Sequence, residues 1–356
     1  MKDIAHSVIH RSLKVKKADK IYVFCLGETP LLTNLLSSIR QVGAHAYIKE
    51  IKLSEWTALI NSGDSSFYRN MFKYEAKIIR HVNGFIGVTQ DSNLFEMNTV
   101  NQVNLKAFYK FFYEPLMNFA QETNKWILLN PPSKALSQLS KQSTNKLNTL
   151  FRHSVLMFNY EEFKREAKWL MDLLKSTNEV SIITHNTNLK FSIKGINPTI
   201  CDGTHNLPGG EVFIAPVLDS VNGYITFNVP FHSFGVTFDY VKLEYEKGEL
   251  ISFDSSNNTK LKDILDSDEG AKYFGEFGIG LNPHINRPIF TSAYDEKMKG
   301  SVHLALGQSY KTSYNFNNST VHMDLVLSML KKDGRGRMYF DNNLVMKDGE
   351  FLPHLV

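Results

Sequence analysis

Hydrophobic and polar positions in the first part of the chain alternate between strand-like and helix-like patterns. Lys20–Leu26 is an almost continuous apolar run, which is typical of a buried parallel strand. Leu31–Val42 has apolar residues at helical spacing and ends at Gly43, and His45–Ile51 predicts the next strand. A strand, a helix and a second strand in this order predict a parallel sheet covered by helices.

The same pattern continues to about residue 178, and we therefore expect a doubly wound α/β domain over residues 1–178. The chain contains neither a Gly-x-Gly-x-x-Gly motif nor a phosphate-binding loop, so the pattern predicts no nucleotide site. The further expected elements are strands at Gly84–Val88 and Lys125–Asn130, and helices at Tyr74–His81, Asn104–Thr123, Asn145–Leu156 and Tyr160–Lys175.

After residue 178 the periodicity changes to short alternating runs separated by turns rich in Gly, Asn and Asp. Gly223–Asn228 and Tyr240–Tyr245 are two such runs, and Gly248–Ile251 predicts the second strand of a hairpin. Asn258–Asp266 has the spacing of a helix. We therefore expect residues 179–356 to form a mostly β, α+β domain.

Four predicted strands of this second half carry a carboxylate or an imidazole among apolar or small neighbours. Alternate residues of a strand share a face, so His322 and Asp324 lie side by side, and Glu276 shares its face with two glycines. Glu211 and His303 lie in equally apolar runs, where a lone charge is costly. Carboxylate and imidazole without thiolate suit zinc, manganese, cobalt or iron(II), and five ligands suffice for two cations.

Composition limits the kinds of partner and the cellular compartment that we expect for this protein. The chain has 356 residues, long enough for two domains, and its 40 basic and 36 acidic residues are interspersed, which indicates neither a nucleic-acid nor a membrane-surface footprint. Two cysteines, Cys25 and Cys201, suggest no disulfide framework. The start of the chain lacks the apolar core of a signal peptide, and no apolar run approaches a membrane span. We therefore expect a cytoplasmic protein.

Residues 203–216, 275–283, 300–310 and 322–324 resemble segments of the thermophilic-type metallo-aminopeptidase family. The resemblance implies a co-catalytic site with two divalent ions (zinc, cobalt or manganese), a peptide substrate, a homodimer, and a catalytic role for the second domain. It also implies that Glu211 or Glu276 moves the proton of the attacking water, and that Tyr310 stabilises the oxyanion. The metal ligands that it implies are Glu211, Glu276, His303, His322 and Asp324.

Two alternatives stay open. A second group on the same scaffold, the mononuclear iron(II) ring-cleaving dioxygenases of dihydroxypyridines, has a similar His-x-Asp pair but a histidine near the position of Glu276. Retention of Glu211 and Glu276 favours the peptidase. The other alternative is a non-catalytic metal-containing homologue. We also expect a short loop over Lys311–Thr320, and a helix start or surface turn at Asp295–Lys297.

Overall fold

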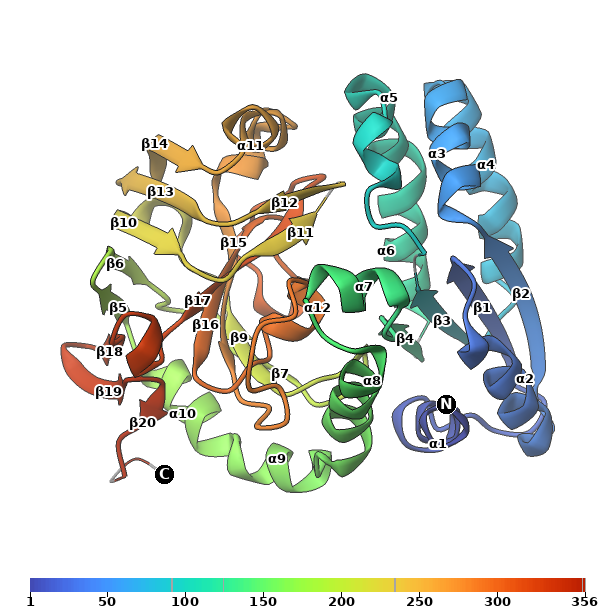
Figure 1. Cartoon of the computed structure of the whole chain (residues 1–356), viewed down its shortest axis with the longest axis horizontal. Coiled ribbons are helices and arrows are strands. Elements are labelled where there is room, and N and C mark those ends of the chain that lie inside the picture. Colours follow the sequence, from blue (N-terminus) through green and yellow to red (C-terminus); the bar gives the residue numbers. More distant parts are fainter. Residues whose placement is uncertain (91, 124, 234, 354, 356) are drawn as a thin grey trace. The chain divides into compact units, whose positions relative to one another are not determined.

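The protein is described by a computed structural model that covers residues 1–90, 92–123, 125–233, 235–353 and 355. The chain divides into two compact units (Figure 1). The first contains Met1–Phe158 and Gly203–Gly209, and the second contains Asn159–Asp202, Gly210–Ser233 and Thr237–Val356. The units therefore change over after Phe158, and the expected domain boundary at residue 178 stays a prediction.

The first unit is built on a parallel sheet, as its sequence pattern predicts. The strand order is β2-β1-β3-β4-β8, with Val23 of β1 paired to Ile48 on one side and Ile86 on the other. The last strand comes from Gly203–Gly209, so the chain returns to this sheet after a long excursion. Among the described residues, the strands are β1 Lys20–Leu26, β2 His45–Ile51, β3 Gly84–Thr89, β4 Trp126–Leu129 and β8 Asn206–Leu207.

Helices of the first unit begin and end at the signals that the sequence carries. The Thr29 side chain accepts a hydrogen bond from the Leu31 amide, and Gly43 ends the same helix with φ 80°. Periodicity missed two helices, α3 and α7, and began α4 too late, because Asp64 caps that helix well before the predicted start at Tyr74. The helices are α1 Lys2–Ser7, α2 Pro30–Val42, α3 Leu53–Ser62, α4 Ser65–Ile79, α5 Gln102–Phe108, α6 Glu114–Glu122, α7 Lys134–Leu139 and α8 Thr144–Arg152.

The second unit contains a large, mainly antiparallel sheet, which confirms the predicted change from alternating helices and strands to a mostly β region. The hairpin predicted near Gly248 joins β13 and β14, and the predicted helix forms α11, Asn258–Leu265. Helices α9 Tyr160–Glu166 and α10 Lys168–Ser176 also belong to this unit. In sheet order, the described strands are β14 Glu249–Ser255, β13 Val241–Glu246, β10 Asn222–Phe227, β6 Thr187–Ser192, β5 Glu179–Thr184, β18 Arg337–Phe340, β19 Asn343–Lys347 and β20 Glu350–Phe351.

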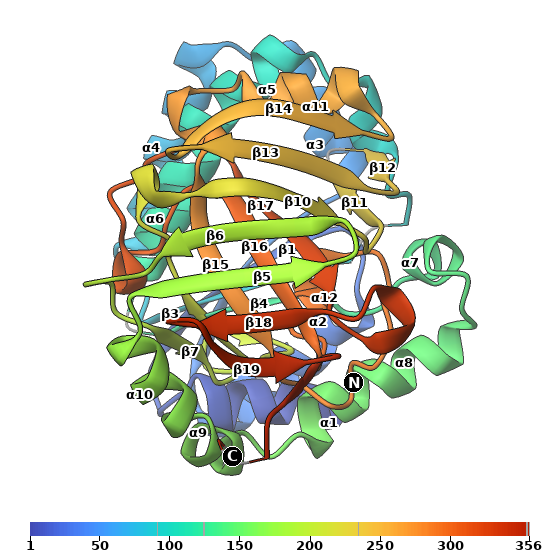
Figure 2. The same ribbon diagram turned by 90° about the vertical axis from the view of Figure 1, so that its left-hand side faces the viewer.

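A smaller antiparallel sheet of the same unit carries the polar residues singled out in the sequence. Figure 2 shows the large sheet in front, with strands of the smaller sheet crossing behind it. Phe277 packs on Phe191 of β6 with ring centroids 5.1 Å apart, and Phe274 packs on Tyr245 of β13 at 4.9 Å. In sheet order, its described strands are β17 His322–Ser328, β16 Ser301–Gly307, β15 Phe274–Gly280, β9 Glu211–Ile214 and β7 Thr199–Cys201.

The packing of the two sheets gives the two faces of β15 different surroundings. Phe277 is buried against the large sheet, and Glu276, its neighbour in sequence, therefore points away from that sheet. The apolar alternate positions of the strand hold the sandwich together, and the polar ones are left for the opposite face. Across the described parts of both units, no helix has the length and apolar character to cross a membrane.

Candidate metal centre

The register of the smaller sheet brings the polar residues of four strands to one face. Each of them is paired across the sheet with a glycine or an alanine, which leaves room above the neighbouring backbone. The antiparallel ladder fixes these neighbours, because slipping it by one residue would turn every side chain to the other face. The pairs are Glu211 with Gly280, Glu276 with Ala305, His303 with Gly278, Asp324 with Ala305 and His322 with Gly307.

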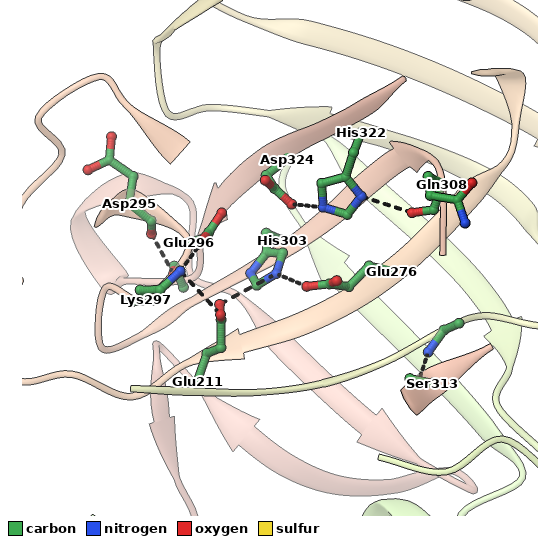
Figure 3. Close-up of polar contacts among 12 residues, drawn as sticks. Glu211, Glu276, Asp295, Glu296, Lys297, His303, Gln308, Ser313, His322 and Asp324 are labelled. Atoms are coloured by element: carbon green, nitrogen blue, oxygen red, sulfur yellow. Dashed lines mark hydrogen bonds and ion pairs between the residues drawn. The ribbon is translucent and has the colours of Figure 1, made fainter. Parts of the chain in front are cut away.

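Three of these side chains form a compact group. Ligand atoms of Glu276, His303 and Asp324 all lie within 4.8 Å of one another. The Nε2 atom of His303 lies 3.0 Å from Oε1 of Glu276 and 3.8 Å from Oε2 of Glu211 (Figure 3). Two carboxylates and one imidazole at these separations can converge on a single cation.

His322 is oriented by the main chain beside this group. Its Nδ1–H donates to the carbonyl oxygen of Gln308 at 2.8 Å, and its Nε2 lies 3.3 Å from Oδ1 of Asp324 (Figure 3). A carbonyl partner on one ring nitrogen fixes which nitrogen faces a metal, as is common for metal-binding histidines. Burial opposes protonation, but the Asp324 carboxylate outweighs it and raises the pKa of His322 to about 10. Metal binding at Nε2 would release that proton.

Buried atoms without partners show that the group fits a cation. Among the described residues, Oε2 of Glu211, Oε2 of Glu276 and Nδ1 of His303 are buried with no hydrogen-bond partner. Burial raises the pKa of Glu276, whereas His322 overcomes the effect of burial and keeps the pKa of Asp324 below its usual range. Unsatisfied buried carboxylate oxygens are costly, and a divalent ion would compensate them.

Tyr310 lies next to the group and stays a phenol. Its ring centroid is 5.1 Å from that of His322 and 5.5 Å from that of Phe213. Burial, reinforced by the charges of Glu276 and Asp324, raises the pKa of Tyr310 well above its ordinary value. A neutral phenol can donate a hydrogen bond, which is the property its predicted role requires.

The short loop predicted between the two histidine strands is anchored in the sheet. The Asn317 side-chain amide donates to the carbonyl oxygens of Gly270 and Gly307 at 2.9 and 2.6 Å. The Asn315 amide donates to those of Pro216 and Phe274 at 2.6 and 2.9 Å. These bonds connect the loop to the ends of β9, β15 and β16, and so help to position the residues that those strands carry.

The expectation for Asp295–Lys297 was wrong. Asp295 ends the short helix α12, Ser292–Asp295, and is buried, with its carboxylate accepting hydrogen bonds from the amides of Ile289 and Phe290 at 2.8 Å. The Lys297 side chain is 1% exposed, and its Nζ contacts Oε1 of Glu296 and lies 3.2 Å from Oε1 of Glu211 (Figure 3).

The local sequence pattern gave no indication that Lys297 contacts Glu211. A charged triplet is most often solvated, and nothing in the spacing around Lys297 pairs it with a strand far earlier in the chain. The available signal was indirect, because Glu211 stands in an apolar run and required a partner.

Comparisons with known proteins agree with the geometry. Residues 1–351 match the family described as Thermophilic metalloprotease (M29). Aminopeptidase 2 of Geobacillus stearothermophilus is 30% identical over 169 residues, which are 42% of this chain and 38% of that protein. Aminopeptidase T of Thermus thermophilus is 28% identical over 151 residues, which are 37% of this chain and 36% of that protein. The aligned segments thus span well under half of these curated relatives.

A solved structure extends the likeness to the whole fold. The wild-type AmpT structure from Thermus thermophilus superposes with a TM-score of 0.80, and the match covers 99% of this chain and 98% of that one. Sequence identity over this match is 16%, so the likeness concerns the fold. It agrees with a parallel N-terminal sheet followed by a largely antiparallel region, as the sequence predicts.

Proposed function

This chain belongs to the thermophilic metalloprotease (M29) family, and we propose that it is a metal-dependent aminopeptidase that removes N-terminal residues from peptides. The family implies a divalent metal ion. The observation that carries the proposal is the convergence of Glu276, His303 and Asp324 within 4.8 Å on the polar face of one sheet.

Glu276, His303 and Asp324 would hold the ion, with Nε2 of His322 beside Asp324 as a fourth ligand. When bound, a divalent ion supplies a Lewis acid that polarises a carbonyl group and lowers the pKa of water. Zinc, cobalt and manganese suit this mixture of oxygen and nitrogen donors. The co-catalytic pair of ions expected from the sequence would draw its second position from Glu211.

The chain's own residues supply the proton transfer and the oxyanion contact. Oε1 of Glu211 is held by Lys297, while Oε2 has no partner among the described residues and faces His303. In our proposal Glu211 takes the proton of the attacking water and passes it to the leaving amine. The phenol of Tyr310 donates to the oxygen that becomes negatively charged when the scissile carbonyl is attacked.

The proposal is tested by restoring metal to protein freed of it by chelation. We expect zinc, cobalt or manganese to restore release of p-nitroaniline from leucyl-p-nitroanilide. N-acetyl-leucyl-p-nitroanilide is the matched control and should resist hydrolysis, because an exopeptidase of this kind recognises a free amino terminus. Absence of activity with each metal, while circular dichroism shows a folded protein, would refute the peptidase.

One observation favours a second candidate, the mononuclear iron(II) ring-cleaving dioxygenase. The group formed by Glu276, His303 and Asp324 is large enough for one ion. Retention of Glu276 still favours the peptidase, because the dioxygenase resemblance places a histidine near that position. Oxygen uptake with a dihydroxypyridine and one iron(II) per chain, without hydrolysis of leucyl-p-nitroanilide, would decide for the dioxygenase.

The homodimer that the family resemblance implies and the cytoplasmic location expected from composition are also proposals. Size-exclusion chromatography with light scattering tests the dimer directly. A mass of one chain, at the concentration used for the peptidase assay, would contradict it.

A further inference from the structure

Two exposed histidines of the first unit lie with their rings against each other. His6 and His10 belong to the first helical stretch of the chain, which consists of α1 and a π-helical turn, Val8–Ser12 (Figure 1). The two ring centroids are 4.1 Å apart, and the ring planes are inclined at 33°. Both residues are exposed to solvent. Two imidazoles at this sequence spacing on one side of a helix are an arrangement that zinc-binding helices use.

Packing of this helical stretch holds the two imidazoles on its outer side. Residues four apart on a helix are neighbours, with Cβ atoms about 5–6 Å apart, so His6 and His10 share one side. The Leu13 amide donates to the carbonyl oxygen of Val8 at 2.9 Å and closes the π-helical turn that contains His10. Because the backbone is already ordered, an ion bound by both rings restricts little more than two side chains. The buried residues on the opposite side are Ile4, Ala5, Val8 and Ile9.

The separation of the two rings fits a shared metal ion. A zinc ion lies about 2.0–2.1 Å from each imidazole nitrogen, so two nitrogens bound to one tetrahedral ion are roughly 3.4 Å apart. Rings whose centroids are 4.1 Å apart reach this nitrogen separation by small rotations of the two side chains. Imidazole nitrogen suits zinc, nickel and copper, whereas calcium and magnesium prefer oxygen ligands. The pair therefore selects a transition-metal ion.

The charges beside the pair are compatible with a bound cation. Asp3 precedes His6 by three residues, a spacing that also makes neighbours on a helix. Its carboxylate lies 3.1 Å from Nη2 of Arg152, and both side chains are 64% exposed. Exposed ion pairs stabilise a protein little, so the carboxylate can turn towards a bound ion at small cost. His10 lies in the last turn of the helical stretch, where the carbonyl end of the helix favours positive charge.

We propose that His6 and His10 bind one divalent transition-metal ion, Cu²⁺, Ni²⁺ or Zn²⁺, at a surface site of the first unit. The two imidazole nitrogens are the protein ligands, and solvent completes the coordination of the ion. Copper binds most tightly of the three, as at other sites built from nitrogen ligands. The site belongs to a different unit from Glu276, His303 and Asp324, and the inference does not depend on peptidase activity.

Retention on a Cu²⁺-iminodiacetate column tests the site, because an ion fixed to a matrix contacts only exposed side chains. Protein without an affinity tag is loaded and eluted with an imidazole gradient. We expect the wild type to be retained, and His6→Ala and His10→Ala each to elute at an imidazole concentration about tenfold lower, equivalent to about 1.4 kcal/mol. Alanine is the best helix former, so both variants keep the helix. His185→Ala is the matched control, because His185 is exposed in the turn between β5 and β6, and it should elute with the wild type.

Calorimetry with Ni²⁺ provides the stoichiometry in solution. Protein is first loaded with zinc and passed through a gel-filtration column, which strips weakly held surface ions. Nickel should then bind at one site per chain in the wild type and at none in the double variant His6→Ala/His10→Ala. Equal retention of the wild type and the double variant would overturn the inference, as would absence of nickel binding in the wild type. An equal loss of retention in His185→Ala would also overturn it, because any exposed histidine would then have the same effect.

Discussion

The imidazole of His303 occupies the space in which a side chain of Gly278 would lie. The two residues are paired across β15 and β16, and a Cβ on Gly278 would fall 2.1 Å from Cε1 and 2.3 Å from Nε2 of the ring. Glycine at this position is therefore required for the observed place of the His303 imidazole, because any larger residue would displace the ring.

Gly278→Ala should weaken metal binding by at least about tenfold, as expected when a ligand loses its support. The measurement is a zinc titration of the apoprotein against a competing chelator. Gly195→Ala is the control: it has φ 80° and is therefore strained, but nothing lies within 4 Å of the added Cβ. An unchanged zinc affinity in Gly278→Ala would show that His303 is not a ligand.

Exchange of the two glutamates for glutamine separates proton transfer from metal binding. Glu211→Gln should keep the zinc held by Glu276, His303 and Asp324 and lower kcat by about 10²–10⁴-fold, because a positioned base is lost. Glu276→Gln should instead lower zinc affinity by about 10–100-fold or more. Zinc counting and steady-state kinetics on both variants distinguish the roles, and loss of zinc from Glu211→Gln would make Glu211 a ligand.

Tyr310→Phe removes a hydroxyl and keeps the ring that packs on His322 and Phe213. Loss of one oxyanion donor should lower kcat about 10²–10³-fold, with little change in KM and in zinc content. Steady-state hydrolysis of leucyl-p-nitroanilide measures both constants. A kcat close to that of the wild type would exclude the assigned role.

Asn317→Ala should lower the free energy of unfolding by about 2–4 kcal/mol, because two buried carbonyl groups lose their donor. Asn318 is a matched control one residue away: it is exposed, and Asn318→Ala should change stability by less than about 0.5 kcal/mol. Urea unfolding of both variants provides the comparison. Equal losses would mean that the loop is not anchored through Asn317.

The loop also carries a predicted acid dependence through Asp268, whose carboxylate accepts hydrogen bonds from the Thr320 amide and hydroxyl at 2.7 and 2.6 Å. Burial opposes ionisation, but hydrogen bonds from Thr320 and Ser319 lower the pKa of Asp268 below its ordinary value of 3.8. A lowered folded-state pKa stabilises the fold above the unfolded value, and this contribution is lost as the pH falls through the folded pKa.

Asp268→Asn should therefore be less stable than the wild type at neutral pH, and the difference should shrink as the pH falls below about 4. Urea unfolding between about pH 7 and pH 3 measures this trend. If the difference in unfolding free energy between the two proteins stays constant over this pH range, the loss of stability does not come from ionisation of Asp268.

Features that depend on local periodicity could be predicted from the amino-acid sequence. Alternation in β15 placed Phe277 and Glu276 on opposite faces, and the same rule put His322 beside Asp324, where the structure has them 3.3 Å apart. Caps such as Thr29 and Gly43 likewise marked helix ends within the sequence. Capping by Asp64, ahead of a weakly periodic stretch, was missed.

The order of the strands in the sheet, and the side chains that meet between them, became known only from the folded chain. Strand register pairs His303 with Gly278 and brings ligand-type atoms of Glu276, His303 and Asp324 within 4.8 Å of one another, which the periodicity of a single strand cannot predict. Lys297 reaches Glu211 because α12 ends at a buried Asp295 and the following segment is bonded to Asn282. A local sequence pattern predicts which residues share a face of one helix or strand. The partner of a buried charge depends on contacts between residues far apart in the chain, and these contacts form only when the sheet is assembled.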